Sequence, residues 1–134
     1  MSGEQLFKIA TKARERAYAP YSGFCVGAAL LCEDGSVYEG CNIENASYTP
    51  TCCAERVALF KAVSEGKRRF LAIAIVGGKD DDLIACYPCG VCRQALSEFC
   101  DRDLKIYLGD GDTVGETTLG ELLPHAFELK KQDV

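Results

Sequence analysis

The sequence lacks the marks of a membrane, secreted or nucleic-acid-binding protein. No apolar run in its 134 residues approaches the length of a membrane span, and no signal-peptide pattern opens the chain. The sequence contains 15 Lys and Arg and 20 Asp and Glu, which gives a formal net charge of −5. Because long nucleic acids are usually bound by a basic face, this balance argues against such a partner. No glycine-rich loop that cradles phosphates is present either, which argues against a nucleotide ligand.

What is present suits one globular domain over residues 1–134. The length allows a real hydrophobic core, and 48% of the residues are apolar, so disorder is not expected. Nine cysteines are an odd number, and without an export signal they favour a reducing cytoplasm over a disulfide framework. Six of them lie outside the motifs described below and are expected to be mostly buried, small apolar side chains: Cys25, Cys32, Cys41, Cys52, Cys86 and Cys100.

The hydrophobic pattern predicts alternating helices and strands. Residues 4–18 form an amphipathic helix that Pro20 ends, and a second helix over residues 53–65 stops at Gly66. Strands are expected at 26–32, 37–42, 71–77, 105–108 and 114–118, further helices at 90–99 and 119–123, and loops at 43–52 and 79–82. The sum is an α/β domain with one mixed five-stranded sheet flanked by helices.

Two short motifs carry thiols and a carboxylate at spacings that suit a metal ion. Cys89 and Cys92 lie three residues apart at the start of a predicted helix, so they share one face and can grip one ion. Cys53 can reach the same ion from a second helix, and three protein ligands leave a fourth tetrahedral position for water, as in catalytic zinc sites. Glu55 lies too far round its helix to ligate beside Cys53 and is better placed as an acid/base group.

Two other interpretations of these cysteines remain open. A structural zinc site needs a fourth ligand, and the single histidine, His125, lies in the tail outside any motif spacing, so Cys52 or Cys86 would have to serve. A redox pair of the thioredoxin type needs no accompanying glutamate. We favour a catalytic zinc because Glu55 and Pro88 accompany the thiols.

These motifs resemble the signature of the zinc-dependent nucleoside and nucleobase deaminases. Cys53-Ala54-Glu55 matches its C-A-E element, and Pro88-Cys89-Gly90-Val91-Cys92 matches its P-C-x-x-C element. With Arg56 after the glutamate and Arg93-Gln94 after the third thiol, the all-cysteine form looks like the small homotetrameric cytidine deaminases. The similarity runs from about Tyr18 to Phe127. It implies a three-layer fold, one zinc ion per subunit, and a homotetramer with shared active sites.

The resemblance also implies a reaction, the hydrolytic deamination of cytidine and 2′-deoxycytidine to the uridines with release of ammonia, as in pyrimidine salvage. Glu55 would move the proton from water to the ring nitrogen and the leaving ammonia. Three thiolates outweigh the charge of a divalent zinc ion, so something positive must offset them. The N-terminal ends of the two helices are one source, and Arg56 or Arg93, hydrogen-bonded to ligand sulfur, is another.

Four residues near the expected pocket are candidates for binding the nucleoside. Asn42 and Glu44 point to the same side of an extended chain, and residues matching them bind the sugar in the family. Alternatively, their polar groups only cap local backbone. Phe24 is expected to stack on the base, or else is an ordinary core aromatic, and Ala46 offers backbone groups to the base.

Two aromatic residues match family positions that act between subunits. Phe127 matches an aromatic that closes the pocket, often that of a neighbouring subunit, and Tyr48 matches an inter-subunit position. The chain departs from the family at Cys25, where proline is frequent, and at Tyr87, where serine is frequent, which leaves the fine substrate preference open. The rivals are deamination of a nucleoside-like antibiotic, a nucleic-acid editing deaminase, and a zinc-stabilised binding module without turnover.

Overall fold

The sheet is built around two strands with almost uniformly apolar side chains. In the computed structural model, which describes residues 1–132, β1 (Phe24–Cys32) pairs antiparallel with β3 (Phe70–Lys79). β2 (Val37–Cys41) flanks β1, β5 (Lys105–Gly109) runs parallel to β3, and β6 (Val114–Thr118) closes the other edge. The order β2-β1-β3-β5-β6 confirms the predicted mixed sheet.

One face of the sheet is covered by a single helix. α1 (Gly3–Ala13) begins at the N-cap Ser2, whose hydroxyl accepts from the backbone of Gln5, and it buries the apolar stripe that the sequence predicted. Leu6 and Ala10 of this stripe pack in a cluster with small side chains of β1 and β3, among them Ala74. Small residues there allow the helix to approach the sheet closely.

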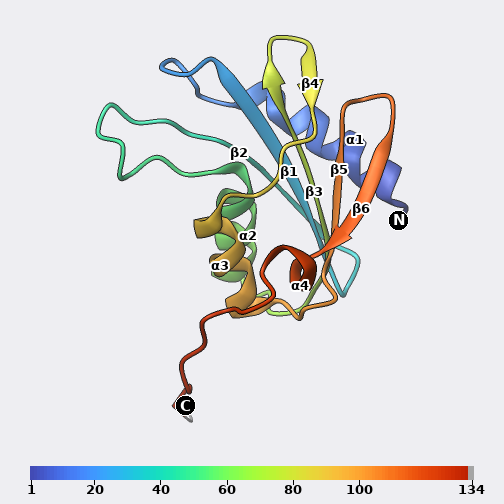
Figure 1. The fold of residues 1–134 in the computed structure, drawn as a ribbon, viewed down its shortest axis with the longest axis vertical. Coiled ribbons are helices and arrows are strands. Elements are labelled where there is room, and N and C mark those ends of the chain that lie inside the picture. Colours follow the sequence, from blue (N-terminus) through green and yellow to red (C-terminus); the bar gives the residue numbers. More distant parts are fainter. Residues whose placement is uncertain (133–134) are drawn as a thin grey trace.

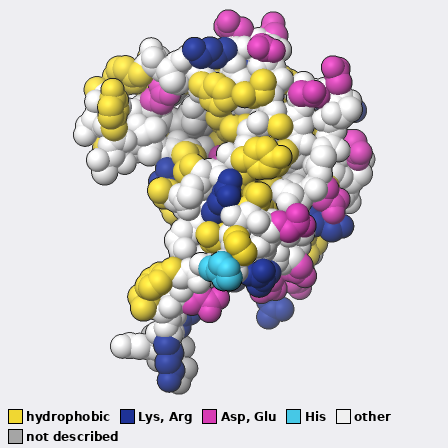
Figure 2. Space-filling view, viewed as in Figure 1, with side chains coloured by type: hydrophobic (Ala, Val, Ile, Leu, Met, Phe, Trp, Pro, Cys, Tyr) yellow, Lys and Arg dark blue, Asp and Glu magenta, His cyan; other side chains and the backbone are white. Residues whose placement is uncertain are grey.

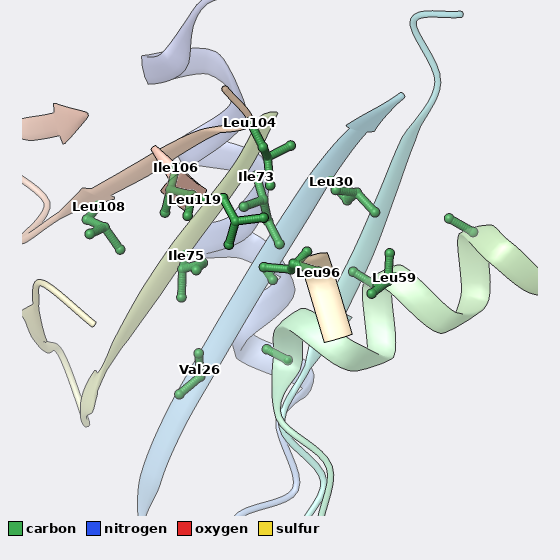
Figure 3. Packing of buried hydrophobic residues seen from close by; sticks show 14 residues of the cluster. Val26, Leu30, Leu59, Ile73, Ile75, Leu96, Leu104, Ile106, Leu108 and Leu119 are labelled. Carbon is green, nitrogen blue, oxygen red and sulfur yellow. The ribbon is translucent and has the colours of Figure 1, made fainter. Parts of the chain in front are cut away.

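The opposite face carries the larger core and the remaining helices. α2 (Ala54–Ser64), α3 (Gly90–Phe99) and α4 (Leu119–Leu122) all lie on this side, so the molecule has the three layers expected (Figure 1). Leu59 of α2 and Leu96 of α3 meet the strand residues at the centre of the cluster (Figure 3). No helix within residues 1–132 is both long and apolar enough to cross a membrane.

The first helix ends sooner than the sequence predicted. Its α-helical part stops at Ala13 and a 3-10 turn, η1 (Arg14–Arg16), follows, so the predicted extension to residue 18 is wrong. The backbone N–H of Tyr18 donates to the carbonyl of Asn42 at 3.0 Å, and Tyr18 bridges to Ile43 in parallel. The chain therefore leaves the helix to pair with the segment after β2, before Pro20 is reached.

A short strand replaces part of a predicted loop and gives the sheet six strands where five were predicted. β3 continues through Lys79, and β4 (Asp82–Ile84) returns along it, although the sequence predicted a solvated loop at 79–82. Asp80 at the tip has a φ of 50°, a left-handed conformation that Asp tolerates better than most residues. The acidic run therefore forms the turn of a tight hairpin.

A close contact with β2 fixes the start of α2. A Cβ on Gly40 would lie 2.4 Å from the carbonyl oxygen of Ala54 and 2.6 Å from the amide nitrogen of Ala58. Only glycine permits backbone to approach backbone this closely. The first turn of α2, with Cys53 just before it, is thus held directly against the sheet.

Candidate metal centre and active site

The three motif cysteines come together at the starts of two helices. Cys53 is the N-cap residue of α2, Cys89 is the N-cap residue of α3, and Cys92 lies in the first turn of α3. Their Sγ atoms all lie within 4.8 Å of one another, and those of Cys53 and Cys89 are 3.8 Å apart. The predicted ligand set is therefore assembled by the fold.

This geometry fits zinc. Two thiolates bound tetrahedrally at about 2.3 Å from one zinc ion lie about 3.8 Å apart, which is the separation seen between Cys53 and Cys89. Among residues 1–132, this is the one group of three or more His, Cys, Asp or Glu side chains able to hold a metal, and it includes neither Cys52 nor Cys86. A structural site closed by one of those two cysteines is therefore not supported.

Glu55 lies buried beside the thiols. Its side chain is on the first turn of α2 and only 3% of the residue is exposed. Burial and, to a smaller extent, the charge of nearby Cys53 together raise the pKa of Glu55 to about 7. A zinc cation held by the thiols would act in the opposite direction. A buried carboxyl group beside the thiols can take up and return a proton.

Arg56 provides positive charge at the sulfurs. Its Nη2 donates to the Sγ of Cys53 at 3.4 Å, as the sequence predicted for one of the two arginines. Hydrogen bonds from Cys92 and then from Arg56 lower the pKa of Cys53, against the effect of burial. The hydrogen bond to the Cys53 thiolate in turn raises the pKa of Arg56. One thiolate is thus stabilised before any metal binds.

Arg93 is placed differently from Arg56. Its Nε donates to the carbonyl of Pro88 at 2.7 Å, and its Nη1 donates to the carbonyl of Leu122 at 2.8 Å. These bonds tie the loop before Cys89 to the end of α4. Arg93 therefore holds the ligand loop in place through backbone carbonyls, where the sequence had suggested contact with sulfur.

Asn42 and Glu44 hold the loop that leads into β1. The side chain of Asn42 accepts from the amide of Val26 and donates to the carbonyl of Phe24, both at 2.8 Å. Glu44 accepts from the amides of Tyr21 and Ser22 at 3.0 and 3.1 Å, and from the Ser22 hydroxyl. These contacts match the capping alternative, yet carboxylate and amide oxygens retain lone pairs for a further partner.

A hollow of about 370 Å³ lies next to Glu44, a size typical of small-molecule sites. Tyr21 and Tyr48 line it together with Ser22, Asn45 and Thr51. A larger hollow of about 670 Å³ surrounds Phe70 at the far end of β3 and contains none of the candidate site residues.

The remaining substrate-binding candidates differ in exposure. Phe24 is half-buried against the core under α2 and α3, whereas Ala46 is exposed. Tyr48 is 84% exposed and Phe127 is 66% exposed, and hydrophobic side chains gather on the protruding loops and on the C-terminal tail (Figure 2). The carbonyl of Phe127 accepts from Gln94 Nε2 at 3.0 Å, which ties the tail to α3. A single chain therefore leaves Tyr48 and Phe127 on its surface.

Gly77 is a residue near the site that the sequence did not single out. A Cβ at this position would lie 2.9 Å from both the Sγ of Cys86 and the Cε1 of Phe24. Both side chains therefore rest directly on the backbone of β3. A glycine inside a buried apolar strand is the signal that such close packing leaves in a sequence.

Replacing Gly77 by alanine is expected to destabilise the protein by about 1–3 kcal/mol, because the methyl group overpacks this contact. Urea unfolding measures the loss, and adding Cys86→Gly should restore part of it. Gly90→Ala is the matched control, since a Cβ there meets nothing within 4 Å. Equal losses for Gly77→Ala and Gly90→Ala would contradict the packing argument.

Comparison with known proteins gives one consistent result. The family model described as the cytidine and deoxycytidylate deaminase zinc-binding region matches residues 1–108. The chain is 52% identical to a cytidine deaminase of Sporosarcina psychrophila over 100% of this chain and 96% of that one. It is 57% identical to one of Halalkalibacterium halodurans over 95% of each. The crystal structure of cytidine deaminase from Burkholderia pseudomallei superposes with a TM-score of 0.87 at 48% identity, covering 95% and 100% of the two chains.

Proposed function

This chain belongs to the cytidine and deoxycytidylate deaminase family, and we propose that Cys53, Cys89, Cys92 and Glu55 form its active site. The reaction is the hydrolytic deamination of cytidine and 2′-deoxycytidine to uridine and 2′-deoxyuridine with release of ammonia, a step of pyrimidine salvage. The observation that carries the assignment is the group of three thiols with the buried Glu55 next to it. A redox pair would require neither the third thiol nor the carboxylate.

Cys53, Cys89 and Cys92 would hold the zinc ion, which would supply a Lewis acid that makes water a nucleophile at neutral pH. Glu55 accepts a proton from the attacking water while the water oxygen bonds to the amino-bearing ring carbon. The same carboxyl gives this proton to the adjacent ring nitrogen, and then carries the second proton, from the new hydroxyl group, to the amino group. The carbon–nitrogen bond breaks, ammonia leaves, and the ring keeps the new oxygen.

The positive charge of Arg56 and the N-terminal ends of α2 and α3 balance the excess negative charge of the thiolates. Arg56 reaches Cys53 directly, and Cys53 and Cys89 are the N-cap residues of the two helices, at the ends where helix dipoles favour negative charge. Withdrawing charge from sulfur keeps the metal a stronger acid.

Four residues recognise the substrate in this proposal. Asn42 and Glu44 bind the sugar hydroxyl groups, Phe24 stacks on the base, and the exposed Ala46 offers backbone groups to it. The support is that Phe24 starts β1, that Asn42 and Glu44 follow β2 and bond to the segment before and at the start of β1, and that Glu44 lines the 370 Å³ hollow. The hydrogen bonds that Asn42 and Glu44 already make orient them for this task.

We also propose that four copies assemble and that Tyr48 and Phe127 complete the pockets of neighbouring subunits. Their exposure on one chain supports this, because large apolar side chains on protruding segments commonly mark contact surfaces.

All nine cysteines are free thiols, which suits a reducing cytoplasm. The net charge of −5 makes stable nucleic-acid binding unfavourable.

The test is an assay of purified, zinc-loaded protein with cytidine, following loss of cytidine absorbance and release of ammonia together. We expect turnover that stops when a strong chelator removes zinc and returns when zinc is added back. Zinc binding without ammonia release would favour the binding module instead. Tight, salt-sensitive binding of single-stranded RNA in a gel-shift experiment would favour an editing enzyme.

A further inference from the structure

The hydroxyl of Ser22 lies between two residues with different proposed tasks. Its Oγ donates to Oε2 of Glu44 and accepts from the backbone amide of Phe24 at 3.0 Å. The backbone amide of Ser22 donates to the other carboxylate oxygen of Glu44 at 3.1 Å. One serine therefore bonds to the carboxylate proposed to bind the sugar and to the backbone of the residue whose ring is proposed to stack on the base.

The backbone of Phe24 is held on its other side as well. Its carbonyl accepts from Nδ2 of Asn42 at 2.8 Å. Asn42 and Glu44 both follow β2. Asn42 bonds directly to the backbone of Phe24, and Glu44 is connected to it through Ser22. Gly23, between Ser22 and Phe24, has a φ of 70° and a Cβ there would meet nothing within 4 Å. The backbone amide of Gly23 donates to the carbonyl of Ala19 at 3.0 Å, and the hydrogen bonds of Ser22 hold the next part of the turn.

We propose that Ser22 is a positioning residue that couples sugar recognition to base stacking, an inference that rests on the proposed function. The carboxylate of Glu44 has three donors around it, from Tyr21 and Ser22, and they fix which lone pairs face a substrate hydroxyl. The same hydroxyl sets where Phe24 enters β1. Without this hydroxyl, the positions of Glu44 and Phe24 are no longer linked by a shared hydrogen-bond partner.

The coupling acts on binding and leaves the chemical step alone. The hydrogen bonds of Ser22 reach Glu44 and Phe24, and none of them reaches the three thiols or Glu55. A substrate that does bind meets an unchanged metal centre. Removal of the hydroxyl should therefore raise KM while kcat stays nearly constant.

The experiment compares Ser22→Ala, Ser22→Thr and a matched control in the zinc-loaded protein. Ser36→Ala is the control, because the Ser36 hydroxyl also donates to a carboxylate, Asp34, at 2.6 Å in an exposed turn. We expect Ser22→Ala to raise the KM for cytidine about tenfold, equivalent to about 1.4 kcal/mol, with kcat within about threefold. Ser22→Thr should restore KM to within about threefold, and Ser36→Ala should leave it unchanged.

Two readouts that do not need turnover separate this inference from the proposed function. The dissociation constant of uridine should rise in parallel with KM, and the amide NMR resonance of Phe24 should shift in Ser22→Ala but much less in Ser22→Thr. A parent protein without turnover would overturn the proposed function alone. Unchanged KM and uridine affinity in Ser22→Ala, or an equal effect of Ser36→Ala, would overturn the positioning role.

Discussion

Glu55→Gln is expected to give a protein that folds and binds zinc but deaminates cytidine about a thousandfold more slowly, within the range of general acid–base catalysis. Glutamine keeps the volume of the buried side chain, so the packing at the start of α2 is preserved. Its amide cannot accept the proton of the attacking water. Steady-state kinetics and zinc content per chain together measure the effect.

Glu65→Gln is the control for that change. Glu65 is the exposed C-cap residue of the same helix, at the opposite end from Cys53. Its carboxylate accepts from the hydroxyl of Tyr38 at 3.3 Å. It should retain full activity. If Glu55→Gln kept a kcat within a few-fold of the parent, the assignment of Glu55 as the proton carrier would be wrong.

Cys92→Ser is expected to lower bound zinc from one ion per chain to less than about a tenth and to remove the stabilisation that zinc confers. Cys92 is fully buried, and it is the ligand that the first turn of α3 adds to the two N-cap cysteines. A serine hydroxyl is a poor ligand for zinc at neutral pH. Elemental analysis and thermal unfolding with and without zinc measure the two effects.

The matched control is Cys86→Ser, three residues before Cys89 but outside the group of converging thiols. The Sγ of Cys86 rests against the backbone of β3 at Gly77 and is not one of the three thiols that converge. Zinc content should not change. Loss of zinc from Cys86→Ser would mean that Cys86 closes the site and that the metal is structural.

The convergence of the three thiols was predictable because much of its geometry is local. Cys89 and Cys92 share a helical face through their spacing alone, and the resemblance supplied Cys53 as their partner. The helical start at each thiol followed from the pattern around Pro88 and from the apolar run after Cys53. The same reasoning applied to Glu55, whose position beside the ligands depends only on its distance along the helix from Cys53.

The features that the sequence did not predict depend on contacts between distant segments. The early end of α1 follows from pairing between Tyr18 and Ile43, which no local pattern encodes. The bridge from Glu44 to Phe24 through Ser22 exists because the segment after β2 lies beside the loop before β1. The roles of Tyr48 and Phe127 stay predictions, since they require a second chain.

X-ray absorption at the zinc edge of the freshly purified protein tests the central claim most directly, because it counts the atoms bound to the metal. Cys53, Cys89 and Cys92 should appear as three sulfur neighbours at about 2.3 Å, with one oxygen or nitrogen neighbour at the remaining position. Four sulfur neighbours, or a protein that holds no zinc, would contradict the account.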